Sequence, residues 1–215
     1  MRNVKFSALI LLPLIAFLLT GSAFADHMKF LGPGGNSGGG VYTYPYNFSI
    51  NGGPSTPLLC DTFDNEVVSG ETWTATVSGL LSGNGLFGNN PNYRAAGLIF
   101  LDVLSGKLNA TTGNWLIWGL FSSNAQSSPY FQSTLANQYL AAAVNAPDSM
   151  FAGLVLYTPV AGTQSWGGLP QEYIGRISVP EPGEVSMILG TLLLGLAGFL
   201  CRKRLGLKLA ISTSR

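Results

Sequence analysis

The ends and the middle of this 215-residue chain carry different patterns of hydrophobic and polar residues. An apolar run covers residues 6–19 near the N-terminus, and an uncharged apolar run covers residues 185–201 near the C-terminus. The middle contains shorter apolar runs, separated by turns rich in Gly, Asn, Ser and Pro. We therefore expect two hydrophobic terminal segments around one domain of about 150 residues.

Short strands are predicted on both sides of a central helical region. The clearest is 72–77, where Trp73, Ala75 and Val77 alternate with threonines, a pattern typical of a half-buried strand. The aromatic stretch 41–48 is also predicted as a strand. Pro45 indicates that it lies at a sheet edge, because proline donates no hydrogen bond to a neighbouring strand. Apolar runs predict three further strands, at 58–63, 151–157 and 172–179.

Three helices are predicted between these strands. Dense apolar residues predict buried helices over 93–104 and 114–121. A third helix is expected to begin at Ser128 and Pro129, an N-cap residue followed by a first-turn proline. Apolar residues then recur every four positions, at Phe131, Leu135, Tyr139 and Ala143. Strands, then helices, then strands predict an α+β fold, a mostly antiparallel sheet with inserted helices.

The N-terminus has the three parts of a secretory signal peptide. Arg2 and Lys5 precede the apolar run, and Ala23-Phe24-Ala25 matches the small-x-small cleavage pattern. We expect residues 1–25 to be removed by signal peptidase between Ala25 and Asp26; an uncleaved membrane anchor is the alternative. A flexible Gly-rich leader is then expected over 26–40, followed by an exported domain over 41–178.

The C-terminus combines a proline motif, an apolar segment and a basic cluster. Pro180-Glu181-Pro182 prevents helix continuation and leaves this segment extended. Residues 185–201 are then just long enough to span a bilayer as a helix. Arg202-Lys203-Arg204 follows, and basic residues favour the cytoplasmic side, so 205–215 would be a cytoplasmic tail.

This ordered triplet over 179–204 resembles the PEP-CTERM sorting signal. The resemblance implies recognition by an exosortase, a membrane-embedded cysteine protease, and sorting to the cell surface or into exopolysaccharide. Residues 205–215 extend past the point where such signals usually stop. A plain single-span anchor with a proline-rich stalk is the alternative interpretation.

The distribution of charge separates the ends from the middle. Net charge is +1, yet all ten acidic residues and only four basic ones lie between Asp26 and Glu184, a net charge of −6. An acidic domain argues against nucleic-acid binding, which needs a basic surface. The single histidine, His27, excludes most Ser-His-Asp and Cys-His sites, and no zinc-type cluster or cofactor motif is present, so we expect no enzyme activity and no cofactor.

The middle also resembles, more weakly, the thioester domain of bacterial surface adhesins. The matching residues are Leu59-Cys60-Asp61, Asn114 to Trp118, Tyr157-Thr158-Pro159 and Gln171-Glu172. In that family a cysteine is linked to a glutamine, and the reactive carbonyl captures an amine on a target. Asn114 stands at the glutamine position, one methylene shorter, so the pair would be Cys60 and Asn114. An inert buried thiol is the alternative.

Two further groups of residues have alternative interpretations. Asp61, Asp64 and Glu66 offer oxygen ligands for Ca²⁺ but lack a full calcium-loop pattern, which favours a solvated acidic turn and no metal. The four tryptophans form either a sugar-stacking face or, as we expect for most of them, parts of the core. They are Trp73, Trp115, Trp118 and Trp166.

These patterns leave three hypotheses for function. The first is a non-enzymatic surface or matrix protein, associated with exopolysaccharide in a biofilm. The second is a covalent adhesin that uses Cys60 and Asn114. The third is a glycan-processing enzyme with a carboxylate pair drawn from residues such as Asp61, Asp64 and Asp102.

Overall fold

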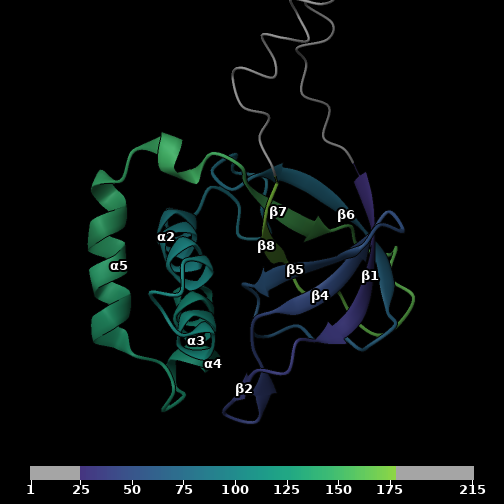
Figure 1. Ribbon diagram of the computed structural model, residues 1–215, viewed down its shortest axis with the longest axis horizontal. Coiled ribbons are helices and arrows are strands. Elements are labelled where there is room, and N and C mark those ends of the chain that lie inside the picture. Colours follow the sequence, from purple (N-terminus) through teal and green to yellow (C-terminus); the bar gives the residue numbers. More distant parts are fainter. Residues whose placement is uncertain (1–24, 178–215) are drawn as a thin grey trace, which may run out of the picture. The chain divides into compact units, whose positions relative to one another are not determined.

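The computed structural model describes residues 25–177 as a closed antiparallel barrel with helices on one side (Figure 1). Around the barrel the strands follow the order β1-β4-β5-β8-β7-β6. Their bounds are β1 Ala25–Pro33, β4 Tyr46–Ile50, β5 Ser55–Cys60, β6 Thr72–Gly79, β7 Leu154–Pro159 and β8 Tyr173–Arg176. The expected α+β class with antiparallel pairing is confirmed, and the sheet closes on itself.

Strand β1 corrects the flexible leader expected over residues 26–40. It pairs with β4 on one side and with β6 on the other, for example Met28 with Ile50 and with Trp73. Met28 and Phe30 are buried while Lys29 and Leu31 are exposed, so the stretch has the period-two pattern of a strand. The alternating residues 28–31 lie directly beside a glycine-rich segment. The composition of that segment favours a flexible leader, and this prediction is wrong for β1.

The glycine-rich segment itself forms a small hairpin outside the barrel. Its strands are β2, Ser37–Gly38, and β3, Val41–Tyr42. The single strand expected over 41–48 is two separate strands, β3 and β4, and a cis Tyr44–Pro45 peptide bond lies between them.

The helices occupy the long connection between β6 and β7. They are α2 Asn92–Leu104, α3 Ala110–Phe121, α4 Ser123–Gln126, α5 Ser133–Asn145 and the 3₁₀ turn η1 Asp148–Phe151. In Figure 1, α2 and α3 lie next to the barrel and α5 lies outside them. Helix α5 begins at Ser133 rather than at Ser128 and Pro129, which form a turn before it.

Two hydrophobic clusters meet along β5, β7 and β8. In β5, Leu58 and Cys60 belong to the cluster inside the barrel, whereas Leu59 belongs to the cluster between barrel and helices. Residues 58–60 of β5 and most of β7 and β8 are buried on both faces, because the helices cover the outside of the barrel there. A strand that is buried on both faces shows no alternation of apolar and polar residues. The sequences of β5, β7 and β8 therefore show only short apolar runs.

Helix α3 contributes to both clusters. Leu116 and Ile117 pack between barrel and helices, while Trp115 and Trp118 join the cluster inside the barrel. Three of the four tryptophans are thus core residues, as expected, and Trp166 is 53% exposed.

Among residues 25–177, no helix is both long and apolar enough to cross a bilayer. Most of the predicted signal peptide and the whole predicted sorting segment lie outside the described residues. The latter includes Pro180-Glu181-Pro182, the predicted span 185–201, Arg202-Lys203-Arg204 and the predicted tail 205–215. The predictions for them stay predictions.

Candidate ligand-binding groove

A groove of about 850 Å³ lies between the β2–β3 hairpin and the connection from β5 to β6. We call it the aromatic groove, because five of its lining side chains are aromatic: Phe30, Tyr42, Tyr46, Phe63 and Trp118. Its polar lining side chains are Asp64, Asn65, Glu66, Ser69 and Gln171. A concave, mostly apolar site with a few polar groups is the usual form of a small-molecule site.

The β5–β6 connection is held in place by hydrogen bonds that reach it from distant parts of the chain. The Gln171 amide donates to the carbonyls of Thr62 and Asn65, at 3.1 and 2.8 Å. The Asn65 amide donates in return to the Pro170 carbonyl, at 3.1 Å. Asn124 at the start of α4 donates to an Asp64 oxygen at 2.7 Å. This side of the groove is therefore built on the segment before β8 and on the helices.

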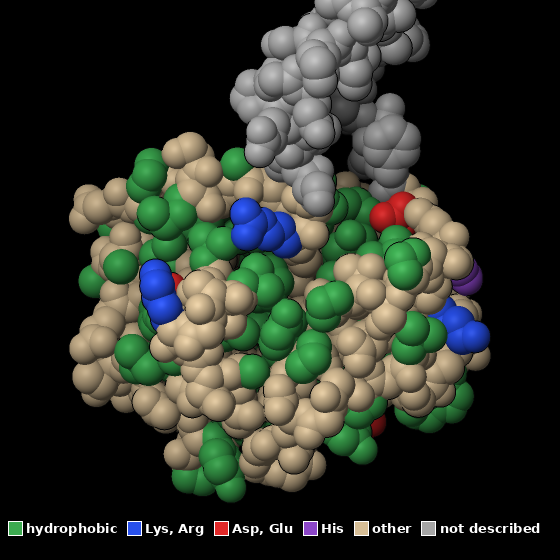
Figure 2. Space-filling model, in the orientation of Figure 1, with side chains coloured by type: hydrophobic (Ala, Val, Ile, Leu, Met, Phe, Trp, Pro, Cys, Tyr) green, Lys and Arg blue, Asp and Glu red, His purple; other side chains and the backbone are tan. Residues whose placement is uncertain are grey.

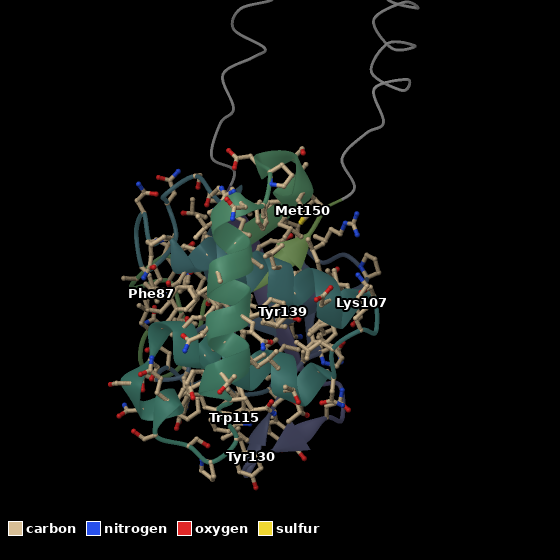
Figure 3. The ribbon with its side chains drawn as sticks, turned by 90° about the vertical axis from the view of Figure 1, so that its left-hand side faces the viewer. Phe87, Lys107, Trp115, Tyr130, Tyr139 and Met150 are labelled. Atoms are coloured by element: carbon tan, nitrogen blue, oxygen red, sulfur yellow. The ribbon has the colours of Figure 1, made fainter. Side chains whose placement is uncertain are left out.

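The hairpin on the opposite side packs against α3 and the turn before α5. The Trp115 indole donates to the Gly38 carbonyl at 3.3 Å, and Trp115 stacks on Tyr130 with ring centroids 5.5 Å apart. Figure 3 shows both rings close together below α5, beside the hairpin. A Cβ at Gly38 would lie 2.3 Å from a Thr111 methyl group, so glycine is required for this close approach.

Cys60 lies beneath the groove, next to Trp118. Its thiol is fully buried and donates to the Thr62 carbonyl at 3.2 Å, while the Trp118 indole donates to the sulfur at 3.4 Å. Burial, and secondarily the charge of Asp61, raises the pKa of the Cys60 thiol far above its usual range. The thiolate, which is the nucleophilic form, is therefore strongly disfavoured at neutral pH.

Asn114 and Cys60 are brought together, but through the main chain of Cys60. The Asn114 amide nitrogen donates to the Cys60 carbonyl, and its oxygen accepts from the Tyr44 backbone N–H, both at 2.8 Å. The side chain is fully buried, and it ties α3 to β5 and to the segment before β4. Both ends of the carboxamide are thus engaged with the backbone, and the Cys60 sulfur has other partners.

A buried carboxyl pair, Asp61 and Glu172, lies at the end of β5. Both side chains are fully buried, and the Asp61 backbone N–H donates to the Glu172 carbonyl at 3.2 Å. Glu172 accepts hydrogen bonds from Thr158, from Tyr93 and from the Leu86 backbone N–H. Burial, followed by the charge of Glu172, raises the pKa of Asp61 well above its ordinary value.

This pair corrects the solvated acidic turn expected at Asp61, Asp64 and Glu66. Only Asp64 and Glu66 are exposed, because Asp61 directly continues the buried end of β5. Within residues 25–177, no three His, Cys, Asp or Glu side chains are grouped so as to hold a metal ion. Two of the three carboxylates considered for glycan processing are also engaged or hidden. Asp61 is buried and inaccessible to a polysaccharide, and Asp102 accepts a hydrogen bond from Tyr139 and forms an ion pair with Lys107.

The sequence pattern predicts neither the groove nor the carboxyl pair as a site. Gln171 and Glu172 are visible as a motif, but their spatial relation to residues 61–65 depends on the pairing of β5 with β8. Comparison with known protein families, with curated proteins and with solved structures finds no match to this chain.

Proposed function

We propose that this chain is an exported, non-enzymatic protein of the bacterial cell surface or extracellular matrix. The observation that carries the proposal is the ordered C-terminal triplet of Pro180-Glu181-Pro182, an apolar run and Arg202-Lys203-Arg204, paired with an N-terminal signal peptide. Signal peptidase removes the front segment and an exosortase processes the tail. The domain is then delivered outside the inner membrane, in association with exopolysaccharide.

The proposal is also supported by the side chains of the described domain. The buried thiol of Cys60 has a raised pKa, and its neighbour Asn114 holds backbone groups. His27 is on the exposed face of β1, away from Cys60 in the barrel interior. These positions suit a binding or matrix role better than nucleophilic catalysis.

Fractionation in a Gram-negative host with an exosortase tests the proposal. We expect the tail to be cleaved and the domain to reach the surface or medium. In an exosortase-deficient strain, or with Glu181→Gln and Pro182→Ala together, the precursor should stay in the membrane fraction. The control Pro129→Ala, at an exposed proline of the domain, should be sorted normally. Equal distribution of the chain with and without the exosortase would refute the sorting proposal.

A covalent adhesin is the second candidate, because Asn114 lies beside Cys60. An internal thioester between these side chains would release one ammonia. The intact mass of the purified chain distinguishes the non-enzymatic matrix protein from the covalent adhesin. We expect the wild type and Cys60→Ala each to have the mass calculated from its sequence, with no loss of ammonia. A wild-type mass about 17 Da low, restored to the calculated value in Cys60→Ala, would establish the adhesin instead.

A further inference from the structure

The aromatic groove presents flat apolar rings to solvent at its rim. Tyr42 is 59% exposed, a high value for so large a side chain, and Phe63, which lines the same groove, is partly exposed. Phe63 packs on Trp115 and Trp118 with ring centroids 5.4 and 5.3 Å apart, which fixes its position. Rigid aromatic faces contribute large contact areas at low cost in conformational entropy, which makes them effective binding surfaces.

The polar side of the groove is rich in hydrogen-bond acceptors. Asp64 and Glu66 are exposed carboxylates, and Asn65 and Ser69 add neutral polar groups. Carboxylate oxygens accept hydrogen bonds from hydroxyl groups, and such charge-assisted bonds are stronger than neutral ones. The groove is therefore suited to a ligand that carries many hydroxyl donors together with apolar C–H faces.

The charge of the groove narrows the class of ligand further. Among the lining residues that belong to the described range 25–177, none is Lys, Arg or His, whereas two carry carboxylates. Figure 2 shows only scattered charged side chains on one face of the domain, and the chain as a whole is only 10% charged. Phosphorylated or uronic-acid ligands would be repelled by these carboxylates, and the described part of the lining offers no cation to offset the repulsion. A neutral ligand meets no such cost.

We propose that the aromatic groove binds a neutral saccharide chain, built from hexose or N-acetylhexosamine units. Sugar rings stack on Tyr42 and Phe63, and the carboxylates of Asp64 and Glu66 accept hydrogen bonds from ring hydroxyls. The volume of about 850 Å³ lies within the range of ligand sites and leaves room for more than one sugar unit. The physiological identity of the polymer rests on the proposed function, whereas the binding site itself does not.

The test uses the full chain in a detergent that contains no sugar headgroup. It is titrated with cellohexaose, chitohexaose and mannohexaose, and with hexagalacturonate as the anionic counterpart. Tryptophan fluorescence and calorimetry follow binding, since Trp118 lines the groove. We expect saturable binding of at least one neutral hexamer and no measurable binding of hexagalacturonate.

Two variants then assign the binding to the groove. Tyr42→Ala should weaken neutral-glycan binding about tenfold, and Glu66→Gln should weaken it less while reducing discrimination against hexagalacturonate. The control Trp166→Ala removes an equally exposed aromatic ring outside the groove and should leave binding unchanged. Thermal melts of all variants check that the fold is retained, and Glu66→Gln stays informative if Tyr42→Ala misfolds.

Failure of all three neutral hexamers to bind would overturn the proposal, as would binding that neither groove variant changes. Preference for hexagalacturonate would also overturn it. Oligolysine, titrated in the same way, is the basic-peptide probe, and its selective binding instead of the glycans would overturn the proposal in favour of a basic protein partner. None of these outcomes alters the fractionation result, so failure of the glycan site and failure of the sorting proposal remain distinguishable.

Discussion

At the residue scale, the end of β5 places a thiol, a carboxamide and two carboxyl groups in one buried region. Cys60, Asn114, Asp61 and Glu172 are all fully buried. Asn114 satisfies two backbone groups. One Asp61 oxygen, Oδ2, meets no donor among residues 25–177, and only a protonated Asp61 could use it for a hydrogen bond to the Glu172 carboxyl group. Buried polar groups stabilise a fold only when their hydrogen bonds are made. Asn114 therefore stabilises the domain, whereas burial of the Asp61 carboxyl group destabilises it.

Asp61 makes the stability of the domain dependent on pH. Folding raises its pKa, so the folded state binds a proton more tightly than the unfolded state. The tighter proton binding contributes to the free energy of unfolding. This stabilisation is fully present below the ordinary aspartate pKa, about 3.9, and is lost as pH rises through the raised pKa of the folded state. The slope approaches about 1.4 kcal/mol per pH unit for one proton.

We therefore expect Asp61→Asn to flatten the stability profile between about pH 4 and neutrality, and to raise stability at its upper end. Asparagine can still accept the hydrogen bond from Thr62, which is 3.0 Å from Asp61 Oδ1. Urea unfolding across this pH range measures the effect. A variant with the same slope as the wild type would show that Asp61 is not the titrating group; Asp64→Asn, at an exposed carboxylate, is the control.

Asn114→Ala tests the structural role of the carboxamide. The change leaves the Tyr44 N–H and the Cys60 carbonyl without their partner, at about 1–3 kcal/mol for each buried group. We expect the free energy of unfolding to fall by roughly 2–5 kcal/mol, measured by urea denaturation. Asn124→Ala, at an exposed asparagine, should cost about 0.5 kcal/mol or less. Equal effects of the two substitutions would contradict this role for Asn114.

At the element scale, close packing of α2 on α3 depends on glycine. A Cβ at Gly113 would lie 2.3 Å from a methyl group of Val103, and 3.5 Å from one of Ile99. Valine is β-branched and stiff at χ1, so Val103 moves aside only with difficulty. Gly113 weakens the helix slightly in isolation, yet it allows the two helices to approach.

Gly113→Ala should therefore destabilise the domain, although alanine is the better helix former. The clash of the new Cβ with Val103 destabilises by about 1–3 kcal/mol. The higher helix propensity of alanine offsets up to about 1 kcal/mol of this loss. We expect a net loss of about 1–2 kcal/mol in urea or thermal unfolding. The control is Gly168→Ala in a loop, where a Cβ would meet no atom of residues 25–177 within 4 Å, and it should be near neutral. An increase in stability for Gly113→Ala would show that α2 and α3 readjust freely.

The elements differ in how well the sequence predicts them, for physical reasons. Strand β6 is half-buried, so its alternation is visible and its prediction is confirmed. Apolar density predicts helices α2 and α3, but it places the start of α3 too late, because Asn109 caps this helix before the apolar residues begin. For strands β5, β7 and β8, which are largely buried on both faces where the helices cover them, the apolar runs predict shifted ends.

At the scale of the whole molecule, β1 closes the barrel. It supplies the partner for β4 and for β6, which are not paired with each other. Without β1 both strands would have unpaired edges, and Met28 and Phe30 would be missing from the barrel interior. The residues that immediately follow the predicted cleavage site are therefore part of the core.

A chain that begins at Val41 should accordingly fail to form the barrel, whereas one that begins at Asp26 should fold. Circular dichroism and thermal melting distinguish the two: we expect a cooperative transition only for the chain that begins at Asp26. The result follows from the lost strand pairing and the lost burial of Met28 and Phe30. A cooperative melt for both chains would support the flexible leader that the composition suggested.

The sequence by itself determined the local features: two hydrophobic ends, an acidic middle, the strand 72–77 and two buried helices. Each depends on neighbouring residues, such as a periodic pattern, a charge run or a motif. Only the tertiary structure decided the closure of the barrel by β1, the burial of Asp61 against Glu172, and the groove. These join residues far apart in the chain, such as Asn114 and Cys60, and their contacts depend on strand order and helix packing that no local pattern encodes.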